Sequence, residues 1–323
     1  MLVAVLLFAV GLVLLIKGGD WFVDGATGIA RKFHVPELLI GATVVSIGTT
    51  LPEVMVSTTS ALSGHGEISY GNAIGSVICN TALIAAISIA AKPSKIDKKT
   101  LRIPVFFFFA AAIYYALIAY FTGRFSRVTG INLLLMFAVY IGVQVYFALK
   151  ASKNGAQSEE HENETENKLG KDIILLVIGA ALIAVGANLL VDNGIIIANG
   201  LGVPESVIAL TFVALGTSLP ELVTAITSLK KGHGLLSLGN VIGANLFNIV
   251  LVSGVSVALA PFDVPNSKQV MGYNSSLLID IPVMFVVMLI LTVPPMISGK
   301  LKRWQGILLL ALYAAFCIFQ FAV

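Results

Sequence analysis

Residues 41–80 of this chain read GATVVSIGTTLPEVMVSTTSALSGHGEISYGNAIGSVICN, and residues 209–248 read ALTFVALGTSLPELVTAITSLKKGHGLLSLGNVIGANLFN. The two segments align without a gap at a shift of 168 residues and are identical at 18 of 40 positions. The same shift carries Asp24 onto Asp192 and Val35–Glu37 onto Val203–Glu205. A repeat of this length predicts two related halves, each with the same order of elements.

The composition of the 323-residue chain is typical of a membrane protein. Hydrophobic residues make up 57% and charged residues 11%, and the mean hydropathy is +0.95, whereas a soluble domain has about 25% charged residues. Ten apolar segments are long enough to cross a hydrocarbon core of about 30 Å, centred near residues 10, 50, 80, 112, 140, 181, 217, 248, 286 and 313. The short alternating segments of a membrane barrel are not seen. We therefore expect an all-α membrane protein with ten transmembrane helices in two inverted five-helix repeats.

The expected repeats are residues 1–149 and 172–323, joined by a charged linker at residues 150–171 that contains SEEHENETENK and is expected to be solvated. Five spans separate equivalent positions, and because five is odd the two halves must face opposite ways, which is typical of transporters. Of the 20 Lys and Arg residues, 17 fall in the odd-numbered loops. Basic loops stay in the cytoplasm, so we expect a multi-pass protein of the cell membrane with both termini outside and the linker inside.

Other classes of function find no support in the sequence. The net charge of +3 gives no reason to expect a nucleic-acid partner. The expected spans hold no Ser/His pair, no paired catalytic Asp and no HExxH motif, so we expect a transporter that is not an enzyme and has no cofactor. No obligate protein partner is evident, and the expected partners are the lipid bilayer and the transported ions.

Two carboxylates mark the expected site. Glu53 and Glu221 are the acidic residues inside the expected spans, apart from Asp280 near an end of one span. A charged carboxylate at membrane depth costs at least about 2.5 kcal/mol unless it is compensated, and the spans offer no Lys or Arg. Because the two glutamates occupy equivalent places in inverted copies, they should approach each other across the pseudo-two-fold axis. A bound cation is their natural partner.

Oxygen-bearing residues surround both glutamates in the sequence. On a helix, residues three, four and seven positions from Glu53 share its face, and the proline before each glutamate frees a backbone carbonyl upstream. The following GN motifs add amide oxygens at four-residue intervals. Hard cations such as Ca²⁺ and Na⁺ prefer such a set, whereas zinc or copper would call for His or Cys. The residues concerned are Ser46, Thr49, Thr50, Ser57, Asn72, Ser76 and Asn80 in the first copy and Thr217, Ser218, Asn240 and Asn248 in the second.

The paired GTTLPEV and GTSLPEL segments, each followed by GN[AV]IG and a further Asn, resemble the two alpha-repeats of the cation/calcium exchanger superfamily, and most closely its sodium/calcium exchanger branch of prokaryotic type. The resemblance implies ten helices and electrogenic exchange of Na⁺ for Ca²⁺. It also implies side-chain ligands at Glu53, Thr50, Ser76, Glu221, Ser218 and Asn248, and backbone ligands at Thr49, Thr217, Ser46 and Ala214.

The sequence departs from the superfamily pattern at two places. Asn248 stands where some relatives, including the potassium-dependent branch, have Asp, and Ala244 stands where they have Ser. K⁺ dependence is therefore not expected, and the number of Na⁺ per Ca²⁺ stays open. The cation/proton branch usually carries an added acidic residue after its GN motif, and here those positions are apolar or small. A Ca²⁺/H⁺ antiporter that uses the same two glutamates remains the alternative, and an ion channel is a second.

Two further expectations concern motion and the surface. We expect Ca²⁺ to leave the cytosol as Na⁺ enters, with the first and sixth spans as the moving pair, because these spans carry Gly11, Gly18, Gly19, Gly179 and Gly186. The remaining polar residues of the repeat are expected to be solvated turns or helix caps near span ends; they are His65, His233, Asp24, Asp192, Glu37 and Glu205.

Overall fold

The computed structural model describes residues 2–155, 169–200, 216, 218–266 and 269–322, and the chain is almost entirely helical. Within these residues, nine helical segments are long and apolar enough to cross a membrane. The prediction of a helical multi-pass membrane protein is therefore confirmed. The expected seventh span, centred near residue 217, falls largely outside the described residues, and α11 (Leu219–Lys230) is its described part.

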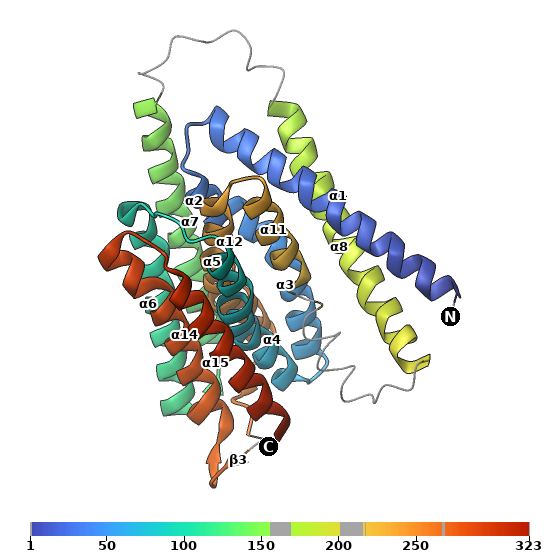
Figure 1. Cartoon of the computed structure of the whole chain (residues 1–323). Coiled ribbons are helices and arrows are strands. Elements are labelled where there is room, and N and C mark those ends of the chain that lie inside the picture. The colour runs from blue at the N-terminus through green and yellow to red at the C-terminus, as the bar shows by residue number, and fades with distance from the viewer. Residues whose placement is uncertain (1, 156–168, 201–215, 217, 267–268, 323) are drawn as a thin grey trace.

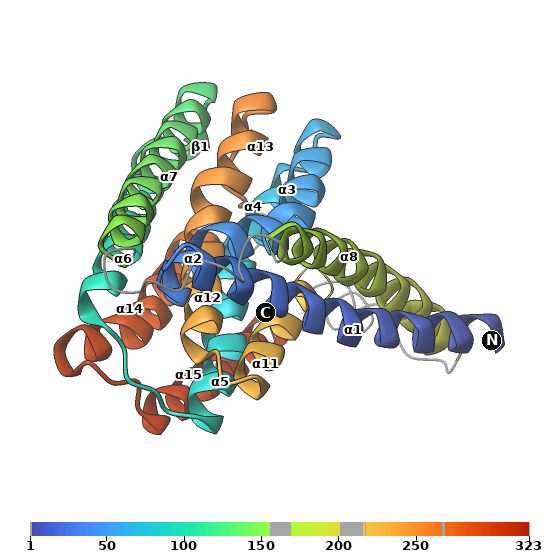
Figure 2. The same ribbon diagram turned by 90° about the horizontal axis from the view of Figure 1, so that it is seen from above.

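Two helices form a separate pair along one edge of the molecule. Helix α1 (Leu2–Lys32) and helix α8 (Leu169–Gly200) lie side by side in both views (Figures 1 and 2). A Cβ atom added to Gly11 would lie 2.8 Å from the carbonyl oxygen of Gly186, and one added to Gly18 would lie 2.9 Å from that of Gly179. Such small residues let two helix backbones approach closely in lipid. Four of the five glycines that the sequence singled out, Gly11, Gly18, Gly179 and Gly186, therefore pack α1 against α8, whereas Gly19 faces Val223 and Thr227 of α11.

The centre of the bundle is formed by the GN-motif helices of the two halves. Helix α4 (Gly66–Cys79) leads into α5 (Ala86–Ala91), and α12 (Gly234–Phe247) leads into α13 (Ser253–Leu259). These two spans are 78% and 83% buried inside the protein, against 28% and 22% for the spans of α1 and α8. The GN motif of the second half, Gly239–Gly243, therefore lies in the protein interior, whereas that of the first half begins at the exposed Gly71 and has a half-buried Asn72.

The outer helices complete the bundle. They are α2 (Glu37–Ile40), which continues into α3 (Ser46–Leu62), then α6 (Lys98–Thr122), α7 (Arg127–Gly155), α14 (Ile281–Ser298) and α15 (Arg303–Ala322). The Tyr140 hydroxyl on α7 donates to the carbonyl oxygen of Ala42 at 2.9 Å and receives a hydrogen bond from Gln144 at 2.7 Å. This contact holds the entry to α3 against α7.

Wide π-helical turns interrupt the central helices at equivalent places. One turn spans Asn80–Ala85 between α4 and α5, and another spans Asn248–Val252 between α12 and α13. Their first residues, Asn80 and Asn248, are 168 positions apart. Two more such turns occupy Gly41–Val45 before α3 and Ser276–Asp280 before α14. A π-turn interrupts the regular backbone hydrogen bonding of a helix and is frequent at functional sites.

Short strand pairs join the loops at the helix ends. Strand β1 (Arg124–Phe125) pairs with β2 (Phe262–Asp263), and β3 (Gln269–Val270) pairs with β4 (Tyr273–Asn274), all antiparallel. The loop between α5 and α6 pairs with the turn between α14 and α15 through a single bridge of Lys95 and Lys300. Each of these contacts except the β3–β4 hairpin links the two halves of the sequence.

The structure differs from the sequence-based expectation for several residues near span ends. Glu37 and His233 were expected to be a cap and a solvated turn, but the His233 Nδ1 lies 2.7 Å from Glu37 Oε1. Asp24 does not cap α1, since its carboxylate pairs with Lys231 at 2.8 Å. The sequence does not show these pairs because their members are about 200 residues apart. Asp192 is exposed, whereas Glu205 lies outside the described residues.

Candidate ion-binding site

The two intramembrane glutamates come from neighbouring helices. Glu53 lies in α3 and Glu221 lies in the first turn of α11, and these helices contact each other. Both side chains are 0% exposed. No Lys or Arg of the described residues forms an ion pair with either carboxylate. The structure therefore brings together two acids without a protein cation.

The carboxylate oxygens lack donors. None of the four oxygens of Glu53 and Glu221 has a hydrogen-bond partner among the described residues. The nearby hydroxyl of Thr49 on α3 donates to Asn240 Oδ1 at 3.2 Å. A buried polar group without a partner costs about 1–3 kcal/mol, and a charged one costs more. The two carboxylates are therefore suited to a positively charged ligand.

Proline shapes the backbone beside each glutamate. Helix α3 continues through Pro52, while α11 begins at Leu219 with Pro220 in its first turn. Proline is tolerated inside a membrane helix when neighbouring groups satisfy the freed backbone. Because Pro52 has no N–H, the carbonyl of Gly48 one turn upstream receives no regular helical hydrogen bond.

Two more predicted pairs are buried and lack partners. The hydroxyls of Thr50 and Ser218, which are equivalent in the repeat, have no hydrogen-bond partner among the described residues. The same holds for both amide atoms of Asn80 and of Asn248, which open the two π-turns. The amide oxygens, hydroxyls and carboxylates are all hard ligands of the kind that Ca²⁺ and Na⁺ prefer.

Other predicted site residues have protein partners. The Ser46 hydroxyl lies within hydrogen-bond distance of two carbonyl oxygens, that of Gly41 at 2.7 Å and that of Asn240 at 3.0 Å, so its side chain joins α3 to α12. This is compatible with the backbone role expected for Ser46 and Thr49. Ser76 is buried on α4. Thr217 and Ala214 lie outside the described residues.

Asn72 takes a role that the sequence did not suggest. Its amide nitrogen donates to the carbonyl oxygen of Glu53 at 3.2 Å and to the Ser57 hydroxyl at 2.8 Å. We expected Asn72 and Ser57 to offer oxygen to an ion, but these contacts hold the turn that carries Glu53. The role depends on how α4 packs against α3, so no local pattern could have found it.

A second buried amide cluster was missed entirely. The Asn245 amide nitrogen donates to the Thr81 hydroxyl at 2.7 Å and lies 3.2 Å from the sulfur of Met288. Comparison of the repeats does not reveal this residue, because its counterpart in the first half is the apolar Val77.

Two hydroxyls of α11 were also missed. The Thr224 and Ser228 hydroxyls are buried on the same side as Glu221 and lack partners among the described residues. Their spacing of three and seven from Glu221 is the signal that would have found them.

A pocket lies beside the site. It has a volume of about 510 Å³ and lies between α3, α8 and α11, where Gly48, Pro52, Gly216 and Pro220 line it. Asn188 and Asp192 of α8 are among its polar lining residues. A smaller cavity of about 10 Å³ adjoins Thr49 and reaches Phe22 of α1. The α1–α8 pair therefore borders the side of the bundle on which Pro52 and Pro220 lie.

Known proteins resemble the chain over nearly its whole length. The family model described as sodium/calcium exchanger protein matches residues 3–146 and 171–322. The sodium/calcium exchanger MaX1 of Methanosarcina acetivorans is 32% identical, with 98% of each chain covered. An uncharacterized membrane protein of Methanocaldococcus jannaschii is 37% identical over 95% of this chain and 94% of its own.

A solved structure shows the same fold. The sodium-calcium exchanger NCX_Mj, soaked with 10 mM Na⁺ and zero Ca²⁺, superposes with a TM-score of 0.82 at 35% identity, and the match covers 97% of both chains. These similarities confirm the prediction of a transporter that is not an enzyme. The chain belongs to the sodium/calcium exchanger family, within the cation/calcium exchanger superfamily.

Proposed function

We propose that this protein exports Ca²⁺ from the cytosol in exchange for Na⁺, and that the two ions compete for the oxygens around Glu53 and Glu221. The observation that carries the proposal is the pair of fully buried carboxylates that have no cationic partner among the described residues. Two formal negative charges match one Ca²⁺, and they also admit Na⁺ at overlapping positions. Family membership and the names of MaX1 and NCX_Mj support these ions as substrates.

The remaining ligands of the proposed site are the equivalent pairs that lack protein partners. Thr50 and Ser218 provide hydroxyls, and Asn80 and Asn248 provide amide oxygens. Ser76 adds a hydroxyl from α4, and Thr49, Ser46, Thr217 and Ala214 provide backbone carbonyls. Because Asn248 and Asn80 are neutral, the glutamates supply the negative charge of the site.

The arrangement of α1 and α8 supports a mechanism of alternating access. These helices pack closely on each other through glycines and border the pocket beside Pro52 and Pro220. We propose that the pair moves as a unit across the bundle and exposes the site to each side of the membrane in turn. The distribution of basic residues supports an orientation with both termini outside and the linker, residues 150–171, in the cytoplasm.

The test is transport in vesicles. Na⁺-loaded vesicles that contain the purified protein should take up ⁴⁵Ca²⁺ when the vesicles are diluted into Na⁺-free buffer. Glu53→Gln or Glu221→Gln should abolish this uptake. Asp280→Asn is the matched control, because Asp280 is also an acid of a membrane span but its carboxylate accepts a hydrogen bond from Gln320 at 2.8 Å. Normal uptake by both glutamate variants would exclude the proposed site.

The alternative is a Ca²⁺/H⁺ antiporter that uses the same two glutamates as proton carriers. Neither carboxylate has a hydrogen-bond donor in the part of the chain that the structure describes, and this geometry favours proton binding as well as metal binding. A pH jump in the absence of Na⁺ separates the two functions. Ca²⁺ uptake driven by the pH jump alone would establish the alternative. Ca²⁺ uptake that needs a Na⁺ gradient and does not respond to the pH jump would exclude it.

A further inference from the structure

Two loops from different halves of the chain meet at one end of the bundle. The amide of Ile96 donates to the carbonyl oxygen of Gly299 at 3.0 Å, and the amide of Leu301 donates to that of Ser94 at 2.8 Å. These bonds flank the bridge between Lys95 and Lys300. The loop between α5 and α6 and the turn between α14 and α15 accordingly run side by side in Figures 1 and 2. The two segments therefore form one surface.

The loops alternate between buried and exposed residues. Ile96 and Leu301 are 6% and 4% exposed and belong to the hydrophobic core. Lys95 and Lys300, which immediately precede these two anchors in the sequence, are exposed. The backbone contacts and the two apolar anchors hold the loops in place, so the lysines point outward from a fixed platform.

Seven basic residues gather on this platform, and we call them the basic patch. Within the part of the chain that the structure describes, none of them forms an ion pair. Six are exposed and Lys98 is half-buried, with its ammonium group donating to the carbonyl oxygen of Ile297. The members of the patch are Lys95, Lys98, Lys99, Arg102, Lys300, Lys302 and Arg303.

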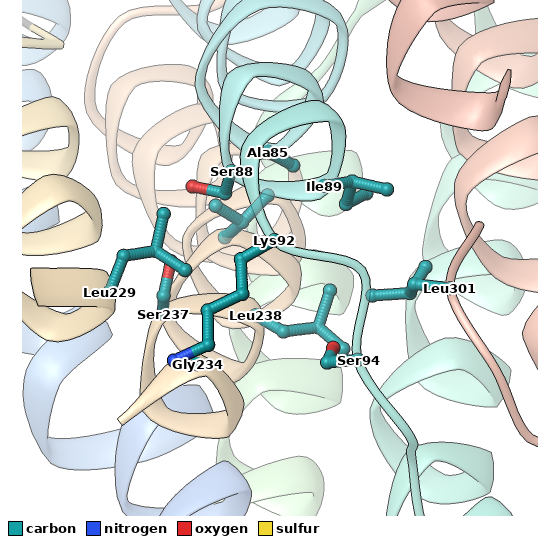
Figure 3. Close-up of a pocket in the computed structure, with 11 residues that line it drawn as sticks. Ala85, Ser88, Ile89, Lys92, Ser94, Leu229, Gly234, Ser237, Leu238 and Leu301 are labelled. Atoms are coloured by element: carbon teal, nitrogen blue, oxygen red, sulfur yellow. The ribbon is translucent and has the colours of Figure 1, made fainter. Parts of the chain in front are cut away.

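Nearby residues of the chain do not neutralise the patch. Asp97 is the acidic residue of the segments 92–102 and 297–303, and its carboxylate caps α6 by accepting hydrogen bonds from the Lys99 amide and the Thr100 hydroxyl. Lys92 does not belong to the patch. Figure 3 shows its side chain turned toward Gly234 at the start of α12, across a small pocket between these segments.

The strand pair β1–β2 gives a useful comparison. There, Arg124 faces Asp263 and the two side chains form an ion pair at 3.6 Å. Asp263 is the repeat counterpart of Lys95, because the two positions differ by 168. Opposite charges across paired strands are favourable, whereas like charges directly opposite are destabilising. The bridge of Lys95 with Lys300 therefore sets two like charges opposite each other, and an anion from outside the chain would relieve their repulsion.

Exposed apolar side chains locate the patch relative to the membrane. Phe106 and Ile307, one helical turn beyond Arg102 and Arg303, are 68% and 58% exposed, as expected for side chains that face lipid tails. Trp304 is half-exposed next to Arg303, and tryptophan is enriched at the membrane–water interface. The basic patch therefore lies where the helices leave the hydrocarbon, at the level of the lipid headgroups.

We propose that the basic patch is a binding site for the headgroups of anionic phospholipids in the adjacent leaflet. Clusters of four to eight Lys and Arg residues at this level attract anionic lipids with about 1 kcal/mol per residue. The seven fixed cations and the bridge of two lysines give this site a higher local charge than single basic residues at helix ends. Anionic lipid bound here clamps the α5–α6 loop to the α14–α15 turn.

Fluorescence of Trp304 provides a direct test that needs no transport. Trp21 and Trp304 are the two tryptophans of the chain, so Trp21→Phe leaves one reporter at the patch. We expect brominated phosphatidylglycerol, mixed into phosphatidylcholine vesicles, to quench Trp304 about two-fold more than its mole fraction predicts, and less so at high salt. Equal quenching by brominated phosphatidylglycerol and brominated phosphatidylcholine would overturn the proposal.

Charge variants make the test specific. Lys95→Gln/Lys300→Gln/Lys302→Gln should reduce quenching to the level set by mole fraction. The control, Lys150→Gln/Lys171→Gln/Lys230→Gln, removes the same charge from exposed residues outside the patch and should keep the excess quenching. Loss of the excess in both variants would indicate a general charge effect and would reject the patch. Loss of the excess on addition of millimolar inorganic phosphate would assign the patch to a soluble anion and would also reject it.

Discussion

The ammonium group of Lys231 lies 2.8 Å from a carboxylate oxygen of Asp24, so the turn between α11 and α12 is tied to α1. Lys231 also donates to the backbone carbonyl oxygen of Asp20 at 2.9 Å and lies 3.5 Å from its carboxylate. In the repeat, the counterparts of Lys231 and Asp20 are Ser63 and Asn188, which carry no charge. The helix that we propose to move is thus held to the bundle by ion pairs at one end.

Replacement of Lys231 by its counterpart residue should weaken this link. The side chains of the pair are partly exposed, so we expect a coupling free energy of about 0.2–1 kcal/mol between Lys231 and Asp24, which falls as salt is added. A double-mutant cycle of Lys231→Ser and Asp24→Asn on the thermal unfolding of the purified protein measures it. Lys230→Ser should show no coupling to Asp24→Asn. Strictly additive effects of Lys231→Ser and Asp24→Asn at low salt would contradict the prediction.

Gly243 should tolerate no side chain. A Cβ atom there would lie 2.3 Å from the Ser46 hydroxyl oxygen and 2.6 Å from the Cα of Ala42. We expect Gly243→Ala to destabilise the protein by about 1–3 kcal/mol, because α12 must move away from α3. The melting temperature and the rate of Ca²⁺ uptake should both fall. The control is Gly142→Ala on the exposed face of α7, where no described atom lies within 4 Å of the added carbon and alanine favours the helix. A Gly243→Ala protein with unchanged stability and uptake would show that the two helices separate easily.

Asn248 should contribute to ion affinity more than to folding. Its amide atoms are buried and lack partners among the described residues, so Asn248→Ala removes a proposed ligand without breaking a hydrogen bond to any of those residues. We expect the KM for Ca²⁺ to rise roughly 10-fold or more, since a contact to a charged group contributes about 1.5–3 kcal/mol.

The matched control is Asn245→Ala, on the same helix turn and equally buried. Asn245 donates to the Thr81 hydroxyl, so its loss should lower the melting temperature while the KM changes little. Measurement of both quantities for both variants separates the roles. An unchanged KM in Asn248→Ala, or the same loss of stability in both variants, would remove Asn248 from the proposed ligands.

Asp97 should make the stability of α6 depend on pH. Its carboxylate accepts hydrogen bonds from the Lys99 amide and the Thr100 hydroxyl, which lower the pKa of Asp97 below its ordinary value. Because the folded-state pKa is depressed, the stabilisation is present above the unfolded pKa of about 3.9 and is lost as the pH falls through the folded value. Loss of the cap in Asp97→Ala should cost about 1 kcal/mol at neutral pH.

Asp97→Asn tests the sign of this pH dependence, because asparagine also caps helices but does not titrate. The difference in stability between the natural protein and Asp97→Asn should be constant above about pH 5 and should shrink at lower pH. Denaturant unfolding followed over this range provides the measurement. A difference that grew as the pH fell would mean that the protonated form of Asp97 is the better cap.

Much of the candidate site could be predicted from sequence, because the same residue types occur at equivalent positions in both copies of the repeat. Glu53 with Glu221 and Asn80 with Asn248 are equivalent positions, and an acid within an apolar span is conspicuous by itself. The structure buries all four side chains. Their role as ion ligands stays a prediction until transport is measured.

The sequence by itself determined that the chain is helical, lies in a membrane and belongs to an exchanger family, since hydropathy and a duplicated motif are local properties. Only the tertiary structure decided which side chains meet. The contact of Ser46 with Asn240, the use of Asn72 to hold Glu53, and the bridge of Lys95 with Lys300 depend on how helices cross and loops dock. The physical reason is that such contacts are selected by the packing of whole helices, and their partners are distant along the chain.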